Sequence, residues 1–76
     1  DIAIEQNIAF AAEIGLSGEL RPVSRIEQRI SEAEKMGFKA IILSKYNFKN
    51  TKNMPSRNIE VVALSKVDDV FSYLFG

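Results

Sequence analysis

The feature that most constrains the fold is the segment of residues 19–44, which has the pattern of a strand, an amphipathic helix and a second strand in immediate succession. Ser24 and Glu27 have the spacing of a capping box, which predicts that the helix begins at Ser24. A connection of this length between two strands is typical of a right-handed parallel crossover. The strand of residues 19–23 is therefore expected to lie parallel to the strand of residues 40–44.

The helix is expected to bury one face and to end at a glycine. Ile26, Ile30 and Ala33 recur every three or four residues, which is the spacing of a single apolar stripe. Gly37 suits the left-handed residue that ends a helix, and Phe38 after it can fold back on Ala33 as a Schellman-type stop. The chain then enters the apolar strand.

Residues 8–14 form a mostly apolar run that ends at Gly15, so they predict a buried strand. The tight turn from Gly15 to Gly18 should return the chain into residues 19–23, with Pro22 near the strand end or on a free edge. The two runs are expected to pair as a hairpin. Residues 1–7 show no regular period and are expected to be irregular.

The C-terminal part predicts one more strand and one more helix. Residues 59–64 are apolar and β-branched, and Ser65 with Asp68 has the spacing of a second capping box. The expected buried face of that helix consists of Val67, Val70, Phe71 and Leu74. The fold class is therefore α/β, in the order β-β-α-β-β-α, with residues 1–76 as a single fragment of one domain.

Composition removes several kinds of chemistry. The 76 residues contain no cysteine and no histidine, so disulfides, thiol nucleophiles, imidazole bases and the usual zinc ligands are excluded. No catalytic, cofactor-binding or metal-binding residue is predicted within this chain. No apolar run is long enough to span a membrane, and the N-terminus lacks the pattern of a signal peptide. A soluble, cytoplasmic protein is expected.

The charges are unevenly distributed although the formal net charge is zero. Residues 44–58 form a loop that has no acidic residue and carries four cations, Lys45, Lys49, Lys52 and Arg57. Tyr46 and Phe48 lie among these cations, and aromatic rings among cations can stack on single-stranded bases. Aromatic residues at a strand end are more often core residues, so for Tyr46 both interpretations stay open.

A long stretch of the chain carries a family resemblance. Residues 12–30 (AEIGLSGELRPVSRIEQRI), 32–39 (EAEKMGFK) and the run IIL at 41–43 resemble the C-terminal, Lon-protease-like domain of the bacterial RadA (Sms) family of DNA repair proteins. The resemblance implies an α/β fold of the ribosomal-protein-S5-domain-2-like group. It also implies a DNA-dependent ATPase that acts in recombinational repair and branch migration, with the Lon-like domain as a ring-forming scaffold that contacts DNA. ATP with magnesium, and zinc, belong to the implied whole protein.

The same resemblance argues against peptidase chemistry. Lon-type peptidases use a serine nucleophile and a lysine base, and aligning the hairpin of residues 18–23 on that family places Glu27 where the family has its lysine. The turn that would carry the nucleophile is absent from this sequence. A remnant of an active serine–lysine peptidase and a pure oligomerisation module remain as alternatives.

The predicted site is a set of cations that contact the phosphates of DNA without reading its sequence. The expected partners are single-stranded or branched DNA and further copies in a homo-oligomeric ring, with no membrane. The competing interpretation is a solvated helix face with ion pairs and a solubilising loop. The candidate nucleic-acid-binding residues are Arg21, Arg25, Arg29, Lys45, Lys49 and Lys52.

Overall fold

The computed structural model describes residues 7–47 and 58–76, so the predictions made for residues 1–6, Phe48, Lys49, Lys52 and Arg57 lie outside the described part. The described part is α/β, as the sequence predicts. Its elements are β1 (Ile8–Ala11), β2 (Glu13–Ile14), β3 (Leu20–Arg21), α1 (Ile26–Lys35), β4 (Ala40–Ser44), β5 (Glu60–Leu64) and α2 (Val67–Phe75).

A parallel sheet of three strands in the order β1-β4-β5 forms the centre of the molecule. In the register of the sheet, Ile42 lies opposite Phe10 on one side and opposite Val62 on the other. All five residues of β4 are buried, because β4 has a strand on each edge and a helix over each face. A parallel strand that is covered on both faces needs a continuous apolar run, and the run at 41–43 meets that need.

The predicted parallel pairing of residues 19–23 with residues 40–44 is wrong. The parallel partner of β4 on this side is β1, whereas β3 pairs antiparallel with β2 in a separate short ladder. The predicted hairpin is present but short, since the first strand divides at Ala12 and only Glu13–Ile14 faces Leu20–Arg21. Pro22 has no N–H to donate, so the ladder of β3 cannot continue past Arg21.

The start of α1 differs from the prediction, and its end agrees with it. The N-cap is Arg25 in a left-handed conformation with φ 56°, and it makes no side-chain cap hydrogen bond, so the capping box of Ser24 and Glu27 is wrong. Ser24 lies one residue too early, and its carbonyl oxygen accepts a hydrogen bond from Arg29 Nε (2.9 Å). At the other end Gly37 has φ 91° and the Phe38 N–H bonds the carbonyl of residue 33 (3.1 Å), which confirms the Schellman-type stop.

The cap of α2 is displaced by one residue from the prediction. Lys66, not Ser65, is the N-cap, and Asp69, not Asp68, accepts a hydrogen bond from the Lys66 N–H (3.1 Å). The Ser65 hydroxyl still contacts the same carboxylate at 3.4 Å. The carboxylate therefore satisfies a backbone donor at the positive end of the helix dipole.

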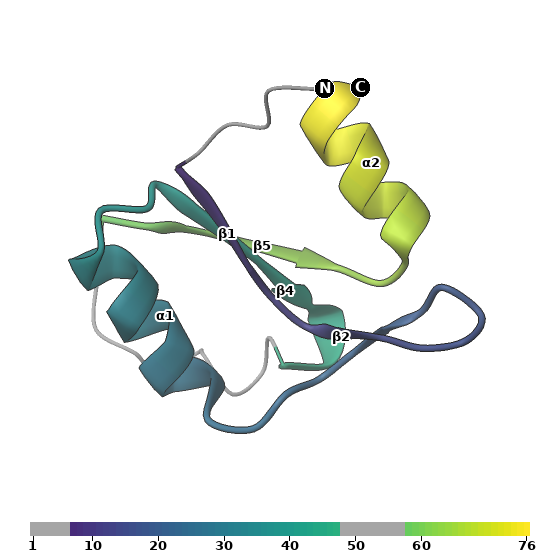
Figure 1. Ribbon diagram of the computed structural model, residues 1–76, viewed down its shortest axis with the longest axis horizontal. Helices are drawn as coiled ribbons and strands as arrows, with labels where there is room; N and C mark the ends of the chain where they lie inside the picture. Colours follow the sequence, from purple (N-terminus) through teal and green to yellow (C-terminus); the bar gives the residue numbers. More distant parts are fainter. Residues whose placement is uncertain (1–6, 48–57) are drawn as a thin grey trace.

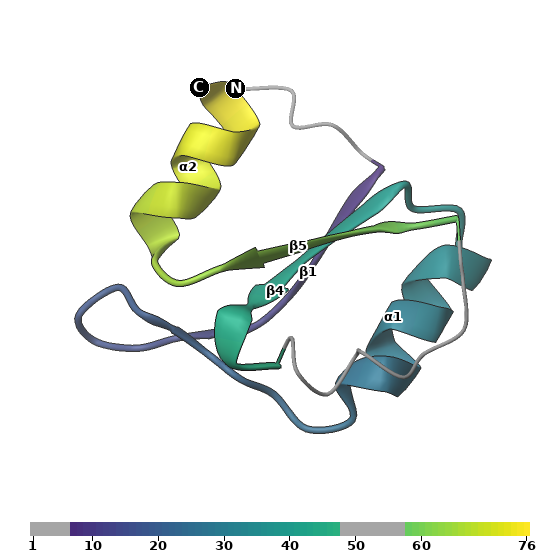
Figure 2. The same cartoon turned by 180° about the vertical axis from the view of Figure 1, so that it is seen from behind.

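The two helices cover opposite faces of the parallel sheet (Figures 1 and 2). The core under α1 consists of Ala11, Ile26, Ile30, Ala33, Ile41, Leu43 and Ile59. The core under α2 is smaller and consists of Leu20, Ile42 and Val70. Phe71, predicted to be buried, is 56% exposed, whereas Val70 of the same helix is 7% exposed. Within residues 7–47 and 58–76, neither helix is long and apolar enough to cross a membrane.

Candidate nucleic-acid interface

The first turns of α1 present two arginines beside a shallow depression. This depression has a volume of about 260 Å³ and is lined by Arg25, Gln28, Arg29 and Glu32. Arg25 is held at the helix start by its left-handed backbone, and its carbonyl accepts the Arg29 N–H (3.1 Å). The bond from Arg29 Nε to the Ser24 carbonyl fixes the second guanidinium. The Glu32 carboxylate, which lines the same depression, lies 3.4 Å from Gln28 Nε2.

This arrangement is suited to an oxyanion. Two guanidinium groups outnumber the one lining carboxylate, and guanidinium presents several N–H donors in a planar fork that matches phosphate. The depression runs along the side of α1 from its N-cap, Arg25, to Glu32 in the second turn. The structure therefore brings Arg25 and Arg29 together as the sequence predicts.

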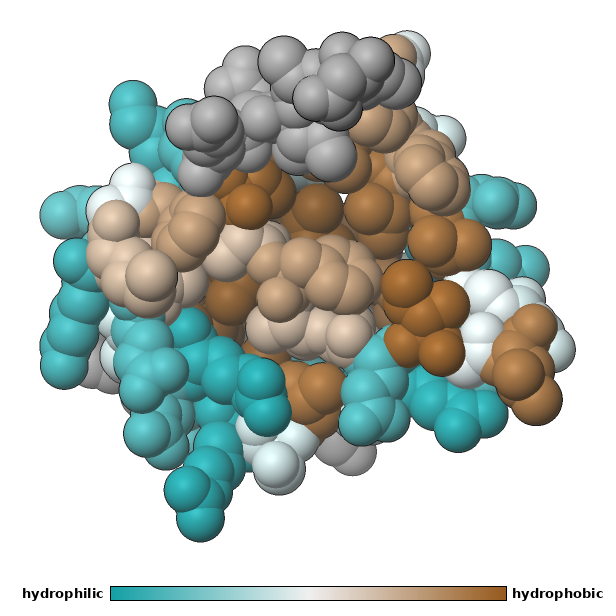
Figure 3. Space-filling model, in the orientation of Figure 1, coloured by the Kyte–Doolittle hydropathy of each residue, from teal (hydrophilic) through white to brown (hydrophobic). Residues whose placement is uncertain are grey.

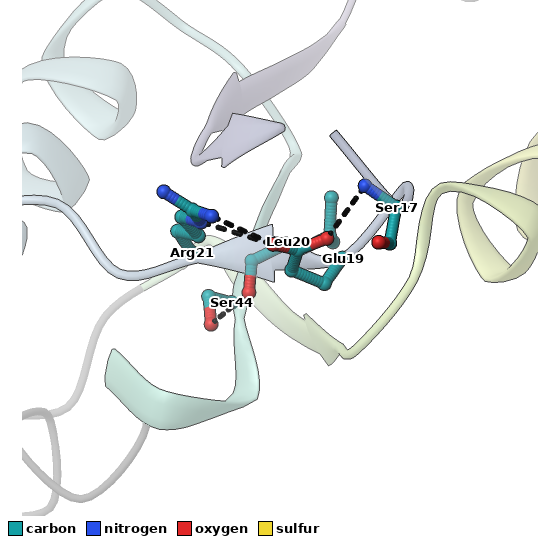
Figure 4. A network of polar contacts seen from close by, with 5 residues as sticks. All are labelled: Ser17, Glu19, Leu20, Arg21 and Ser44. Atoms are coloured by element: carbon teal, nitrogen blue, oxygen red, sulfur yellow. Dashed lines mark hydrogen bonds and ion pairs between the residues drawn. The ribbon is translucent and has the colours of Figure 1, made fainter. Parts of the chain in front are cut away.

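Arg21 is already engaged by an acid. Its Nε and Nη2 atoms donate to Glu19 Oε2 at 3.1 and 2.9 Å, and the Ser17 N–H donates to the other oxygen at 3.1 Å (Figure 4). The backbone N–H of Glu19 itself and the Arg21 side chain lower the pKa of the Glu19 carboxyl. The ion pair neutralises much of the charge that Arg21 would offer to a phosphate, so Arg21 is the weakest of the four described candidates.

Lys45 lies in a short 3₁₀ turn, residues 45–47, that follows β4. Its Nζ atom is 5.3 Å from the centroid of the Tyr46 ring, within the range of a cation–π contact. Both side chains are exposed. Lys49 and Lys52 lie outside the described residues, so their placement relative to Lys45 stays a prediction.

Two buried polar residues hold this turn, and the sequence reasoning missed both. Ser44 Oγ donates to the Leu20 carbonyl (3.0 Å) and accepts from the Tyr46 N–H (3.1 Å), as Figure 4 shows for the first bond. Asn47 accepts from the Val23 N–H (2.9 Å) and donates to the Val23 carbonyl (3.0 Å). The turn that carries Lys45 is thereby tied to the segment between β3 and α1, which connects Arg21 to Arg25.

Neither Glu27 nor Ser44 is placed for peptidase chemistry. Glu27 is exposed in the first turn of α1, where a carboxylate favours the helix dipole. Ser44 is fully buried and donates its hydroxyl proton to a backbone carbonyl, so no base activates it. Among residues 7–47 and 58–76, no group of three histidine, cysteine, aspartate or glutamate side chains could hold a metal ion.

Comparison with known proteins identifies the family. The model of the Lon protease (S16) C-terminal proteolytic domain matches residues 1–76. This chain belongs to the Lon C-terminal domain family. Its similarity is to the form of that domain found in RadA proteins: it is 47% identical over 64 residues to "DNA repair protein RadA" of Halalkalibacterium halodurans, which is 84% of this chain and 14% of the relative.

Two further relatives carry the same name. The RadA of Streptococcus pyogenes serotype M1 is 46% identical over 68 residues, covering 90% of this chain and 15% of the relative. The RadA of Bacillus subtilis is 40% identical over 67 residues, covering 88% and 14%. The chain therefore corresponds to about one seventh of the length of these relatives, and the expected resemblance to the Lon-like domain of RadA is confirmed.

Proposed function

We propose that this domain is the non-proteolytic scaffold and DNA-contact domain of a RadA-type DNA repair protein. The observation that carries the proposal is the pair of guanidinium groups, Arg25 and Arg29, beside one depression on the side of the first two turns of α1. The printed name of the relatives, a DNA repair protein, supplies the biological setting. Phosphate is a ligand that guanidinium groups bind and that DNA carries.

The contact that we propose is directed at the DNA backbone. Arginine and lysine neutralise phosphates whatever the base sequence is. Among the described residues, the candidate cations lie in β3, at the start of α1 and in the turn after β4. They are not gathered along a single helix that could enter a groove. The domain would therefore add affinity without adding sequence specificity, and single-stranded or branched DNA would be accepted.

The activities of the whole protein are part of the same proposal. The resemblance to RadA suggests a DNA-dependent ATPase that uses ATP with magnesium, carries zinc, forms a homo-oligomeric ring in the cytoplasm and drives branch migration in recombinational repair. Such functions would need the remainder of a protein in which a domain of this size makes up 14–15% of the length. A ring would present the few cations of each copy together, which strengthens a weak contact through multivalency.

The salt dependence of DNA binding tests the arginine pair. Each phosphate contact contributes about 0.9 to the slope of log affinity against log salt on duplex DNA, so Arg25→Gln with Arg29→Gln should lower the slope by about two per engaged subunit of the intact protein. Lys35→Gln is the matched control, because Lys35 is an exposed cation in the last turn of the same helix. A double variant with the wild-type slope would remove the arginine pair from the interface.

A second set of variants tests the loop. Lys45→Gln, Lys49→Gln and Lys52→Gln combined in the intact protein should weaken DNA binding, flatten the salt slope and slow branch migration. Wild-type affinity, slope and rate would leave the domain as a scaffold alone. That result would favour the oligomerisation module, an alternative that the exposed aromatic side chains of Phe71 and Phe75 also support.

The peptidase alternative has a direct test. Glu27 occupies the position of the lysine in the Lon alignment, and a carboxylate cannot serve as the base that a serine–lysine dyad needs. We expect neither the chain nor its Glu27→Lys variant to digest casein. Digestion by the purified wild-type chain would overturn the non-proteolytic assignment.

A further inference from the structure

The turn of residues 45–47 combines one exposed aromatic ring with two buried polar anchors. Tyr46 is 59% exposed, whereas Asn47 beside it is 2% exposed and Ser44 is fully buried. The ring is not needed to complete either core, since neither includes it. The ring is therefore available for a contact outside the fold.

The anchors hold the backbone of the turn in place before any ligand arrives. Asn47 bonds both polar backbone groups of Val23, and Ser44 joins the Leu20 carbonyl to the Tyr46 N–H. These hydrogen bonds are buried or part-buried, and breaking one would leave a backbone group without its partner. A ligand that stacks on Tyr46 therefore has little backbone left to order, and preorganisation of this kind strengthens binding.

One cation beside the ring favours an anionic ligand. Lys45 Nζ lies 5.3 Å from the ring centroid, and residues 44–47 contain no acid. The anchors also tie the turn to the segment that leads into α1, where Arg25 and Arg29 lie. A nucleic-acid strand offers both a flat ring for Tyr46 and phosphates for these cations.

We propose that Tyr46 stacks on an unpaired base of single-stranded DNA while Lys45 contacts the neighbouring phosphate. Base pairs in a duplex already stack on their neighbours, so only a strand with accessible base faces can use the ring. This inference rests on the proposed DNA contact and adds to it a preference for single-stranded over duplex DNA. Ser44 and Asn47 act as positioning residues for the ring.

The test compares strands that share phosphates but differ in bases. Fluorescence anisotropy of the intact protein is measured with oligothymidine, with an abasic strand of equal length and with duplex DNA. Tyr46→Ala should weaken binding of oligothymidine about tenfold, within the range known for one stacked base, and should leave the abasic strand and the salt slope unchanged. Tyr46→Phe should bind like the wild type, because it keeps the ring.

Lys45→Gln should behave differently from the tyrosine variant. It should lower the salt slope on single strands by about 0.7 per engaged subunit and should affect the abasic strand as much as oligothymidine. Tyr73→Ala is the matched control, since Tyr73 is an exposed tyrosine on α2, and it should change nothing. Circular dichroism of each variant checks that the fold is retained.

The outcomes separate this inference from the proposed function. Equal loss on the abasic strand, or wild-type affinity of Tyr46→Ala for oligothymidine, would overturn the stacking while leaving the phosphate contact in place. If the arginine and lysine variants have the same salt slope as the wild type on every DNA tested, the proposed DNA contact itself is wrong. Tighter binding of duplex than of oligothymidine would also contradict the proposed preference.

Discussion

The two faces of the parallel sheet are covered to very different degrees. On the α1 face, three helix residues, Ile26, Ile30 and Ala33, are buried against the sheet. On the α2 face only Val70 of the helix is buried, although α2 is the more apolar helix. The α1 face is thus a completed core, whereas the α2 face leaves apolar side chains in solvent.

The exposed apolar surface extends over more than α2. Figure 3 shows brown and tan surface from α2 across the middle of the molecule towards the turn of the hairpin. Phe71 and Phe75 stack on each other with ring centroids 6.1 Å apart, and Phe10 on β1 is 45% exposed. Contiguous apolar surface of this kind is a feature of interaction sites, so this face is where we expect the proposed assembly to form. The fold of the chain completes the core on the α1 face and leaves the α2 face partly uncovered.

The largest effect that we expect separates the two cores. Ile30→Ala should lower the free energy of unfolding by about 2–5 kcal/mol, because it leaves a cavity in the completed core. Leu74→Ala on the half-buried α2 face should cost about 1 kcal/mol, because less apolar surface is lost from the interior. Urea unfolding of the two variants measures both values. Equal losses would show that the faces are equally well packed.

Self-association should depend on the α2 face. Phe71→Lys should weaken association of the chain about tenfold, as removal of an aromatic anchor commonly does. Met36→Lys is the control, since Met36 is also apolar and exposed but lies after α1. Sedimentation equilibrium gives the association constants. A strictly monomeric wild type at high concentration, or equal weakening by both variants, would contradict this assignment.

The left-handed N-cap offers a way to stabilise the α1 face further. Arg25 has φ 56°, a conformation that strains any residue with a Cβ atom and suits glycine. Arg25→Gly should therefore raise the free energy of unfolding by about 0.5–1 kcal/mol while weakening DNA binding. Thermal unfolding reports the first effect. A lower melting temperature would mean that the guanidinium stabilises the fold more than the backbone strain costs.

The smallest effect that we expect is a loss of stability at low pH in the hairpin of β2 and β3, which lies beside α2. The pKa of Glu19 is lowered by its own backbone N–H and by Arg21. The ionised carboxylate therefore stabilises the fold fully at pH values above its ordinary pKa of 4.5. This stabilisation is lost as the pH falls through the lowered pKa. Amide exchange of Leu20 and Val67, whose N–H groups join the hairpin to the start of α2, should rise there before that of Leu43. Glu19→Gln should abolish this difference in pH dependence.

What the sequence predicts correctly is local. The Schellman stop at Gly37 and the apolar stripe of α1 depend on residues within one or two turns of each other, so their pattern is visible in the chain. The parallel partner of β4 cannot be identified from the sequence pattern, because β1 and residues 19–23 both precede the helix and both have strand character. The longer β1 pairs with β4 along four residues, whereas Pro22 limits the strand of residues 19–23 to a short ladder.

The candidate site divides in the same way. Arg25 and Arg29 are one helical turn apart and come together as the periodicity requires. The Arg21–Glu19 ion pair spans two residues. Its short spacing is visible in the sequence, but the prediction of Arg21 as a phosphate contact did not take it into account. Ser44 and Asn47 gave no signal, because their partners are backbone groups 24 residues earlier in the chain.

The two hydrogen bonds between Asn47 and Val23 also bear on the order of folding. They join the two ends of a segment that contains α1 and β4, and the segment between them is closed without help from β1 or β5. The loop that these bonds close is shorter than the loop between the paired residues of β1 and β4, so closing it loses less chain entropy. We expect this segment to form before β1 adds to the sheet, so that Asn47→Ala slows refolding more than it speeds unfolding in stopped-flow measurements.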